Sequence, residues 1–169
     1  MDTPPSKAPI HRLALWACLA LVVVDSIRLL TAGGSERPAS LLGLPLDDAW
    51  IHLSYARSLA ESGVFGYNPG VWENGSTAPL WSVLLAVPQA VGLHPVLAAK
   101  VLSILSALLL TTLLWFVAAE LGGVRVATLA VVILVLEPWT SVLAVSGMEA
   151  TAASAAAMGA VLLALRGRW

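Results

Sequence analysis

Two adjacent carboxylates, Asp47 and Asp48, are the side chains of this sequence whose type and spacing best suit chemistry. They follow Pro45 and begin a stretch, 47–63, that reads as one short helix ended by Gly63. Adjacent residues of a helix point about 100° apart, so the two carboxylates cannot do the same task. One can face a substrate while the other caps the helix or holds a cation, and either carboxylate also suits the positive end of the helix dipole.

The same predicted helix carries further candidate side chains. An apolar stripe at i, i+4 spacing consists of Ile51, Tyr55 and Leu59. This stripe predicts a helix that lies along a membrane surface. His52 lies off the stripe and either pairs with Asp48 or is simply exposed. Arg57 is either a phosphate partner or a solvated residue of the helix face.

The segment after this helix alternates turn residues with the aromatic residues Phe65, Tyr67, Trp72 and Trp81. These rings form either an aromatic belt at the headgroup level of a membrane or a platform for a sugar or a lipid-linked headgroup. Two more charged candidates lie farther along the chain. Glu149 precedes the last apolar run and is either a carboxylate at a helix start or a partner of the Asp pair. Lys100 either contacts a phosphate or extends along apolar surface to reach water.

The composition decides the class of protein. The 169-residue chain is 59% hydrophobic and 11% charged, whereas a soluble domain has about a quarter charged residues. Its 9 Lys+Arg and 10 Asp+Glu give a net charge of −1, with no basic stripe for a nucleic acid. One cysteine and three scattered histidines predict neither a disulfide framework nor a metal site with regular ligand spacing. The composition therefore excludes a soluble enzyme, a disordered protein and a nucleic-acid binder, and it predicts an integral membrane protein.

The apolar runs predict an all-α integral membrane fold in which a cytoplasmic tail, 1–12, precedes one membrane module, 13–169. The predicted spans are 13–30, 95–121, 124–145 and 150–165. The run 79–93 lies in the interface in the preferred interpretation, or it crosses as a fifth span. With four spans, loop 31–94 is extracytoplasmic, and the positive-inside rule is met by Lys7, Arg12, Arg125, Arg166 and Arg168. We expect a multi-pass protein of the inner (cell) membrane with all three acidic candidates on its outer face.

Three blocks of residues carry a resemblance. The first runs from Asp47-Asp48-Ala-Trp-Ile through Tyr55-Ala56-Arg57 to Gly63. The second is Asn68-Pro69-Gly70 followed by Glu73-x-Gly75-Ser76-Thr77-x-Pro79-Leu80-Trp81, and the third is Ser146-Gly147-Met148-Glu149-Ala150. In this order they resemble the first and second external loops of GT-C-type membrane glycosyltransferases. The nearest likeness is to bacterial arabinofuranosyl- and mannosyltransferase-like enzymes that use polyprenyl-phosphate sugars.

The resemblance implies the inverting transfer of a sugar from a polyprenyl-phosphate donor to an extracytoplasmic acceptor. It implies that Asp47 is the general base. It also implies that Asp48 and Glu149 orient the substrate or bind a divalent cation, Mg²⁺ or Mn²⁺. The further substrate-binding candidates are Arg57, His52, Tyr55, Trp72 and Lys100.

The sequence also departs from that family. Ser54 stands where members often carry Arg, and the chain covers only the N-terminal part of a family that is several times longer. A missing C-terminal half, or another membrane subunit, is therefore an expected partner. The alternative is a non-catalytic polytopic protein. Asp25 and Glu137 would suit a piece of a transporter, and the small residues Ala155 and Gly159 would suit a scaffold helix.

Overall fold

The computed structural model describes residues 8–31 and 43–167, with side chains from residue 13 onward. Every described element is a helix: α1 Ala8–Thr31, α3 Asp48–Ser62, α4 Pro79–Ala90, α5 Pro95–Leu136, α6 Pro138–Ala144 and α7 Ala150–Leu165. Three of them begin at a proline, whose fixed φ suits the first helical position and whose missing N–H is not needed there. Lys7, Arg168 and the side chain of Arg12, on which the predicted orientation partly depends, lie outside the described residues.

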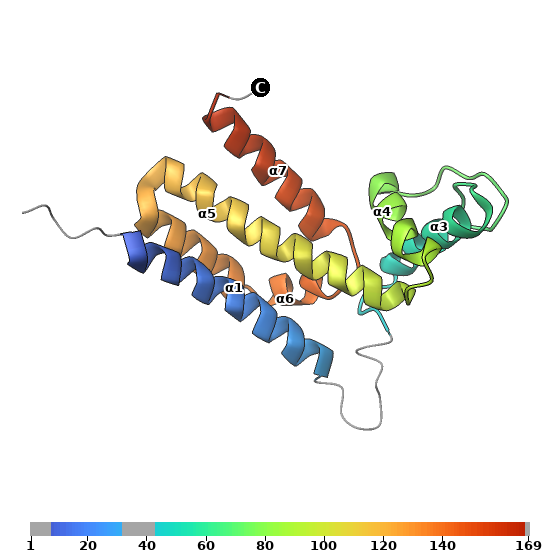
Figure 1. Ribbon diagram of the computed structural model, residues 1–169, viewed down its shortest axis with the longest axis horizontal. Helices are drawn as coiled ribbons and strands as arrows, with labels where there is room; N and C mark the ends of the chain where they lie inside the picture. Colours follow the sequence, from blue (N-terminus) through green and yellow to red (C-terminus); the bar gives the residue numbers. More distant parts are fainter. Residues whose placement is uncertain (1–7, 32–42, 168–169) are drawn as a thin grey trace, which may run out of the picture.

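Within residues 8–31 and 43–167, two helices are long and apolar enough to cross a membrane, whereas the sequence predicted four spans. They are the segment Leu13–Thr31 of α1 and the 42-residue helix α5. The helix α5 reverses at Gly123, whose φ of 73° and ψ of −176° lie in a region open almost only to glycine. Figure 1 shows the second arm of α5 doubling back beside α1. The reversal falls where the sequence separated its second and third spans.

The predicted span 124–145 is wrong as a continuous helix. The chain leaves the helix at Glu137, which has φ −72° and ψ 119°, and starts again as α6 at Pro138. A residue before proline is pushed away from helical dihedrals, and proline offers no N–H for the helical ladder. The Glu137 carboxylate then caps α6 by accepting a 2.9 Å hydrogen bond from the backbone N–H of Thr140. This carboxylate therefore stabilises the start of α6.

The short helix predicted over 47–63 is present as α3, and Gly63 ends it with a left-handed φ of 70°. Its predicted apolar stripe is only partly correct, because Ile51 is 38% exposed while His52 is 1% exposed. The buried face consists of Ala49, His52, Leu53, Tyr55, Ala56 and Ser58. The packing of α3 against α4 decides which face of α3 is buried. The spacing of residues along the helix could not predict that face.

Two apolar cores result. One joins α1, both arms of α5 and the end of α6 around Trp115 and Val131. The other joins α3, α4 and the first turns of α5 around Trp81 and Leu85. In Figure 1 the pair α3 and α4 lies at the end of the molecule where α5 begins. On the remaining helix, Ala155 of α7 is 1% exposed, and a side chain at Gly159 would lie 3.7 Å from Leu113 of α5, so the small-residue face packs inside the chain.

Candidate functional site

The turn between α6 and α7, residues 145–149, forms a corner that docks on α4. Gly147 adopts a left-handed φ of 76° in this corner. Its carbonyl oxygen accepts a 2.9 Å hydrogen bond from the indole Nε1 of Trp81, a side chain that is 4% exposed. A Cβ at position 147 would lie 2.9 Å from a methyl group of Leu44 and 3.3 Å from Cβ of Ala99, and the positive φ itself favours glycine. The third block of the resemblance thus lies against the second.

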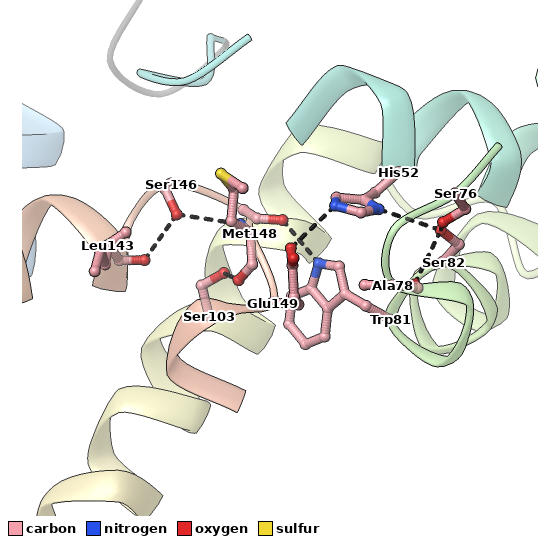
Figure 2. Close-up of polar contacts among 11 residues, drawn as sticks. His52, Ser76, Ala78, Trp81, Ser82, Ser103, Leu143, Ser146, Met148 and Glu149 are labelled. Atoms are coloured by element: carbon pink, nitrogen blue, oxygen red, sulfur yellow. Dashed lines mark hydrogen bonds and ion pairs between the residues drawn. The ribbon is translucent and has the colours of Figure 1, made fainter. Parts of the chain in front are cut away.

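The same corner reaches α3 through Glu149. Its Oε2 lies 3.0 Å from Nε2 of His52, and the imidazole Nδ1 lies 3.4 Å from the hydroxyl of Ser82. The Ser82 hydroxyl in turn lies 3.2 Å from that of Ser76. Figure 2 shows the imidazole between the carboxylate and the serines. The interpretation of His52 as a surface residue or a partner of Asp48 is therefore wrong, because the packing of α3 on α4 buries it and the corner supplies its acidic partner.

The corner is also tied to α5. The Ser103 hydroxyl donates to the carbonyl oxygen of Met148 at 3.3 Å, and the Thr151 hydroxyl donates to the carbonyl oxygen of Ser103 at 3.3 Å. Both hydroxyl side chains on this contact are buried. Hydrogen bonds to α5 therefore hold the Met148 carbonyl just before Glu149 and the Thr151 side chain just after it.

The acidic pair Asp47-Asp48 begins the helix that Glu149 contacts. Asp47 occupies the N-cap position with helical dihedrals and makes no side-chain capping bond, and both carboxylates are on exposed residues. His52 lies about one helical turn after Asp48. The Asp pair and the Glu149 corner therefore lie at the same end of the molecule. Within residues 8–31 and 43–167, however, no three His, Cys, Asp or Glu side chains gather closely enough to hold a metal ion.

Tyr55 is bound to its own loop. It is 3% exposed, its hydroxyl accepts a 2.9 Å hydrogen bond from the backbone N–H of Gly75, and its ring lies 4.9 Å from that of Phe65. A side chain at position 75 would lie 2.8 Å from the Tyr55 hydroxyl. Glu73 holds the other side of this loop by accepting hydrogen bonds from the backbone and side chain of 67–68. These contacts give Tyr55 a structural role in the loop.

The remaining candidates differ in their surroundings. Trp72 is 71% exposed, as an aromatic belt or a sugar platform requires, and Arg57 is exposed on α3. Trp81 was predicted to share the role of Trp72 but is an internal hydrogen-bond donor. Lys100 is 2% exposed and lines a cavity of about 340 Å³. The other residues of this cavity are apolar or glycine: Leu29, Leu30, Gly43, Leu44, Pro45, Val142 and Val145.

Sequence reasoning missed the roles of Trp81, Ser82 and Ser76. Ser76 and Trp81 stand in the second block of the resemblance, and the spacing of Trp81 and Ser82 to Leu85 and Ala86 marks a buried face of α4.

Comparison of the whole chain with known proteins finds no relative: no protein family, no curated protein and no solved structure matches it. The functional conclusion therefore depends on the residues and their geometry.

Proposed function

We propose that this chain is the N-terminal part of a GT-C-type membrane glycosyltransferase that takes a sugar from a polyprenyl-phosphate donor. One observation carries the proposal. The corner 145–149 docks on α3 and α4, with the His52–Glu149 contact of 3.0 Å, so it lies at the end of the molecule where Asp47-Asp48 begins α3. Three sequence blocks that resemble external loops of one family thereby meet in space.

In the proposed reaction an acceptor hydroxyl oxygen attacks the anomeric carbon of the donor sugar. As the new C–O bond forms, the bond from that carbon to the lipid phosphate oxygen breaks, and the phosphate leaves with the electron pair. Asp47 takes the hydroxyl proton, a role for which its exposed carboxylate is available because it makes no capping bond. Attack opposite the leaving group inverts the anomeric centre.

The lipid phosphate needs positive charge as it leaves. Lys100 and Arg57 are the proposed partners among the described residues, and Lys100 contributes a cation to an otherwise apolar cavity. The residues Asp48 and Glu149 do not by themselves form a set of three metal ligands. A Mg²⁺ or Mn²⁺ ion at these carboxylates stays a prediction, and no step above depends on it.

The proposed topology has four crossings: α1, the two arms of α5 with the second continued by α6, and α7. The first arm, 95–122, is about 40 Å long, which exceeds the roughly 30 Å of a bilayer core. Its first turns can therefore extend beyond the core on the side where α4 lies. The reversal at Gly123 is followed by the exposed Arg125. Close by, Arg166 at the end of α7 lies 2.9 Å from Glu120. Cations at this end support a cytoplasmic side there and an extracytoplasmic side at α3.

The test replaces Asp47 by Asn at the native locus and uses native membranes, which keep any partner subunit. Vesicles receive a radiolabelled polyprenyl-phosphate sugar, and the release of polyprenyl phosphate is measured. We expect Asp47→Asn to lower the rate by about 10²–10⁴-fold, the usual contribution of a positioned base. Glu61→Gln, an exposed acid at the far end of α3, is the matched control and should leave the rate unchanged. Unchanged transfer by Asp47→Asn at normal abundance would remove the base and the proposal with it.

A further inference from the structure

The buried imidazole of His52 is not used by the transfer step, yet it is the group that touches Glu149. It is 1% exposed and lies between three parts of the chain, namely α3, α4 and the corner 145–149 (Figure 2). We propose that His52 is a positioning residue that fixes the Glu149 carboxylate relative to the Asp pair in the transfer site. This inference rests on the proposed function and names a residue on which the site depends.

The contacts around His52 are consistent with one chain of hydrogen bonds that donates from Ser76 through Ser82 and His52 to Glu149. An ionised carboxylate only accepts, so contact with Glu149 favours the imidazole form that carries its proton on Nε2. In the neutral ring the other nitrogen, Nδ1, is then an acceptor for the Ser82 hydroxyl at 3.4 Å. The carbonyl oxygen of Ala78 is the competing acceptor for the same hydroxyl, at 3.5 Å. The Ser76 hydroxyl, 3.2 Å away, can donate to Ser82 and complete the chain.

The Glu149 carboxylate depends on this contact. Its Oε2 atom is buried, and among the described residues no hydrogen-bond donor reaches it with good alignment, so the 3.0 Å contact with the imidazole is its one polar contact there. The Glu149 side chain as a whole is 26% exposed. A buried carboxylate oxygen without a partner is costly, so loss of the imidazole should release the carboxylate toward solvent.

Because His52 is on α3, its contact with Glu149 fixes the distance between Glu149 and the acids at the start of α3. His52 and Asp48 are fixed relative to each other by about one turn of the same helix. Holding Glu149 at His52 therefore sets the separation between the acids at the start of α3 and the acid of the corner. Glu149 is the acid that we expect to orient the substrate, and displacement of an orienting group by about 1 Å can cost about 10²-fold in rate.

The first test compares two substitutions of His52 in the native-membrane assay. The amide nitrogen of Gln can take the place of Nε2 and donate to Glu149, whereas Leu fills the space without a donor. We expect His52→Leu to lower kcat per folded protein by about 10²-fold with the KM for the donor little changed. His52→Gln should recover most of this loss. The control on the same helix is Ser54→Ala, because the Ser54 hydroxyl donates to the carbonyl oxygen of Trp50 in its own helix.

A merely structural role gives a different result. Activity would then follow the amount of folded protein in both variants, and kcat per folded molecule would stay at the wild-type value. That outcome overturns the positioning role, and if Asp47→Asn still lowers the transfer rate, the proposed function stays intact. If instead Asp47→Asn has no effect, the proposed function fails first.

A second test does not need activity. The full chain has three histidines, so ¹⁵N-histidine labelling in nanodiscs gives few signals, and His52→Gln assigns the one from His52. We expect a proton on Nε2, and we expect both Glu149→Gln and Ser82→Ala to shift the His52 nitrogen signals. A neutral ring protonated on Nδ1, or His52 nitrogen signals that do not shift in Glu149→Gln, would overturn the inference.

Discussion

The indole Nε1 of Trp81 donates a 2.9 Å hydrogen bond to the carbonyl oxygen of Gly147. This bond joins the first turn of α4 to the corner between α6 and α7, two segments far apart in the sequence. It lies in the same docking surface as the His52–Glu149 contact, in which the corner meets both α3 and α4 (Figure 2). The polar contacts of this surface make one site from blocks that are separate in the chain.

The first prediction concerns this bond. Trp81→Phe keeps an aromatic ring but leaves the Gly147 carbonyl oxygen without its donor, so we expect a loss of about 1–3 kcal/mol in the free energy of unfolding. Unfolding in mixed detergent micelles measures the change. The matched control is Trp72→Phe, because Trp72 is 71% exposed and should change stability by less than about 0.5 kcal/mol. Equal effects of the two substitutions would contradict the role of the bond.

The second prediction separates crowding from backbone strain at Gly147. Gly147→Ala and Gly92→Ala both place an alanine at a positive φ, 76° and 80° respectively. Each should lose about 1–2 kcal/mol from that strain. Only position 147 also meets neighbours, Leu44 at 2.9 Å and Ala99 at 3.3 Å, whereas position 92 faces open space. The Gly147 variant should therefore lose about 1–3 kcal/mol more stability, as overpacking does, in the same unfolding assay. A loss no greater than that of Gly92→Ala would show that the corner is not tightly docked.

The third prediction distinguishes a structural from a substrate-binding role of Tyr55. Tyr55→Phe keeps the ring packing and removes the acceptor of the Gly75 N–H, so hydrogen exchange of the loop 64–78 should become faster. Tyr67→Phe, on an exposed residue of the same loop, is the control. A fall in sugar transfer with unchanged loop exchange would instead assign Tyr55 to the substrate.

The fourth prediction concerns topology. The chain has one cysteine, so Cys18→Ala gives a background for single cysteines at exposed positions. Glu61→Cys on α3 should react with a membrane-impermeant maleimide on intact cells, and Arg125→Cys should react only after permeabilisation. Labelling of both from the same side would contradict the proposed four crossings.

Much of the local structure could be predicted because it depends on residues close together in the chain. Pro79 and Pro95 begin helices, and Gly63 ends one, as their backbone preferences dictate. The reversal of α5 follows from Gly123 for the same reason. The break at Glu137 was not predicted, because the apolar run 124–145 continues through it, although proline pushes the residue before it away from helical dihedrals.

By itself, then, the sequence determined an apolar, helical chain with an acidic helix start and predicted which segments lie near it. Only the tertiary structure decided that α3 buries His52 instead of Ile51 and that Trp81 points inward. It also decided that His52 takes Glu149 as its partner. The physical reason is that spacing fixes which residues share a helix face, whereas the choice of the buried face depends on how several helices pack at once.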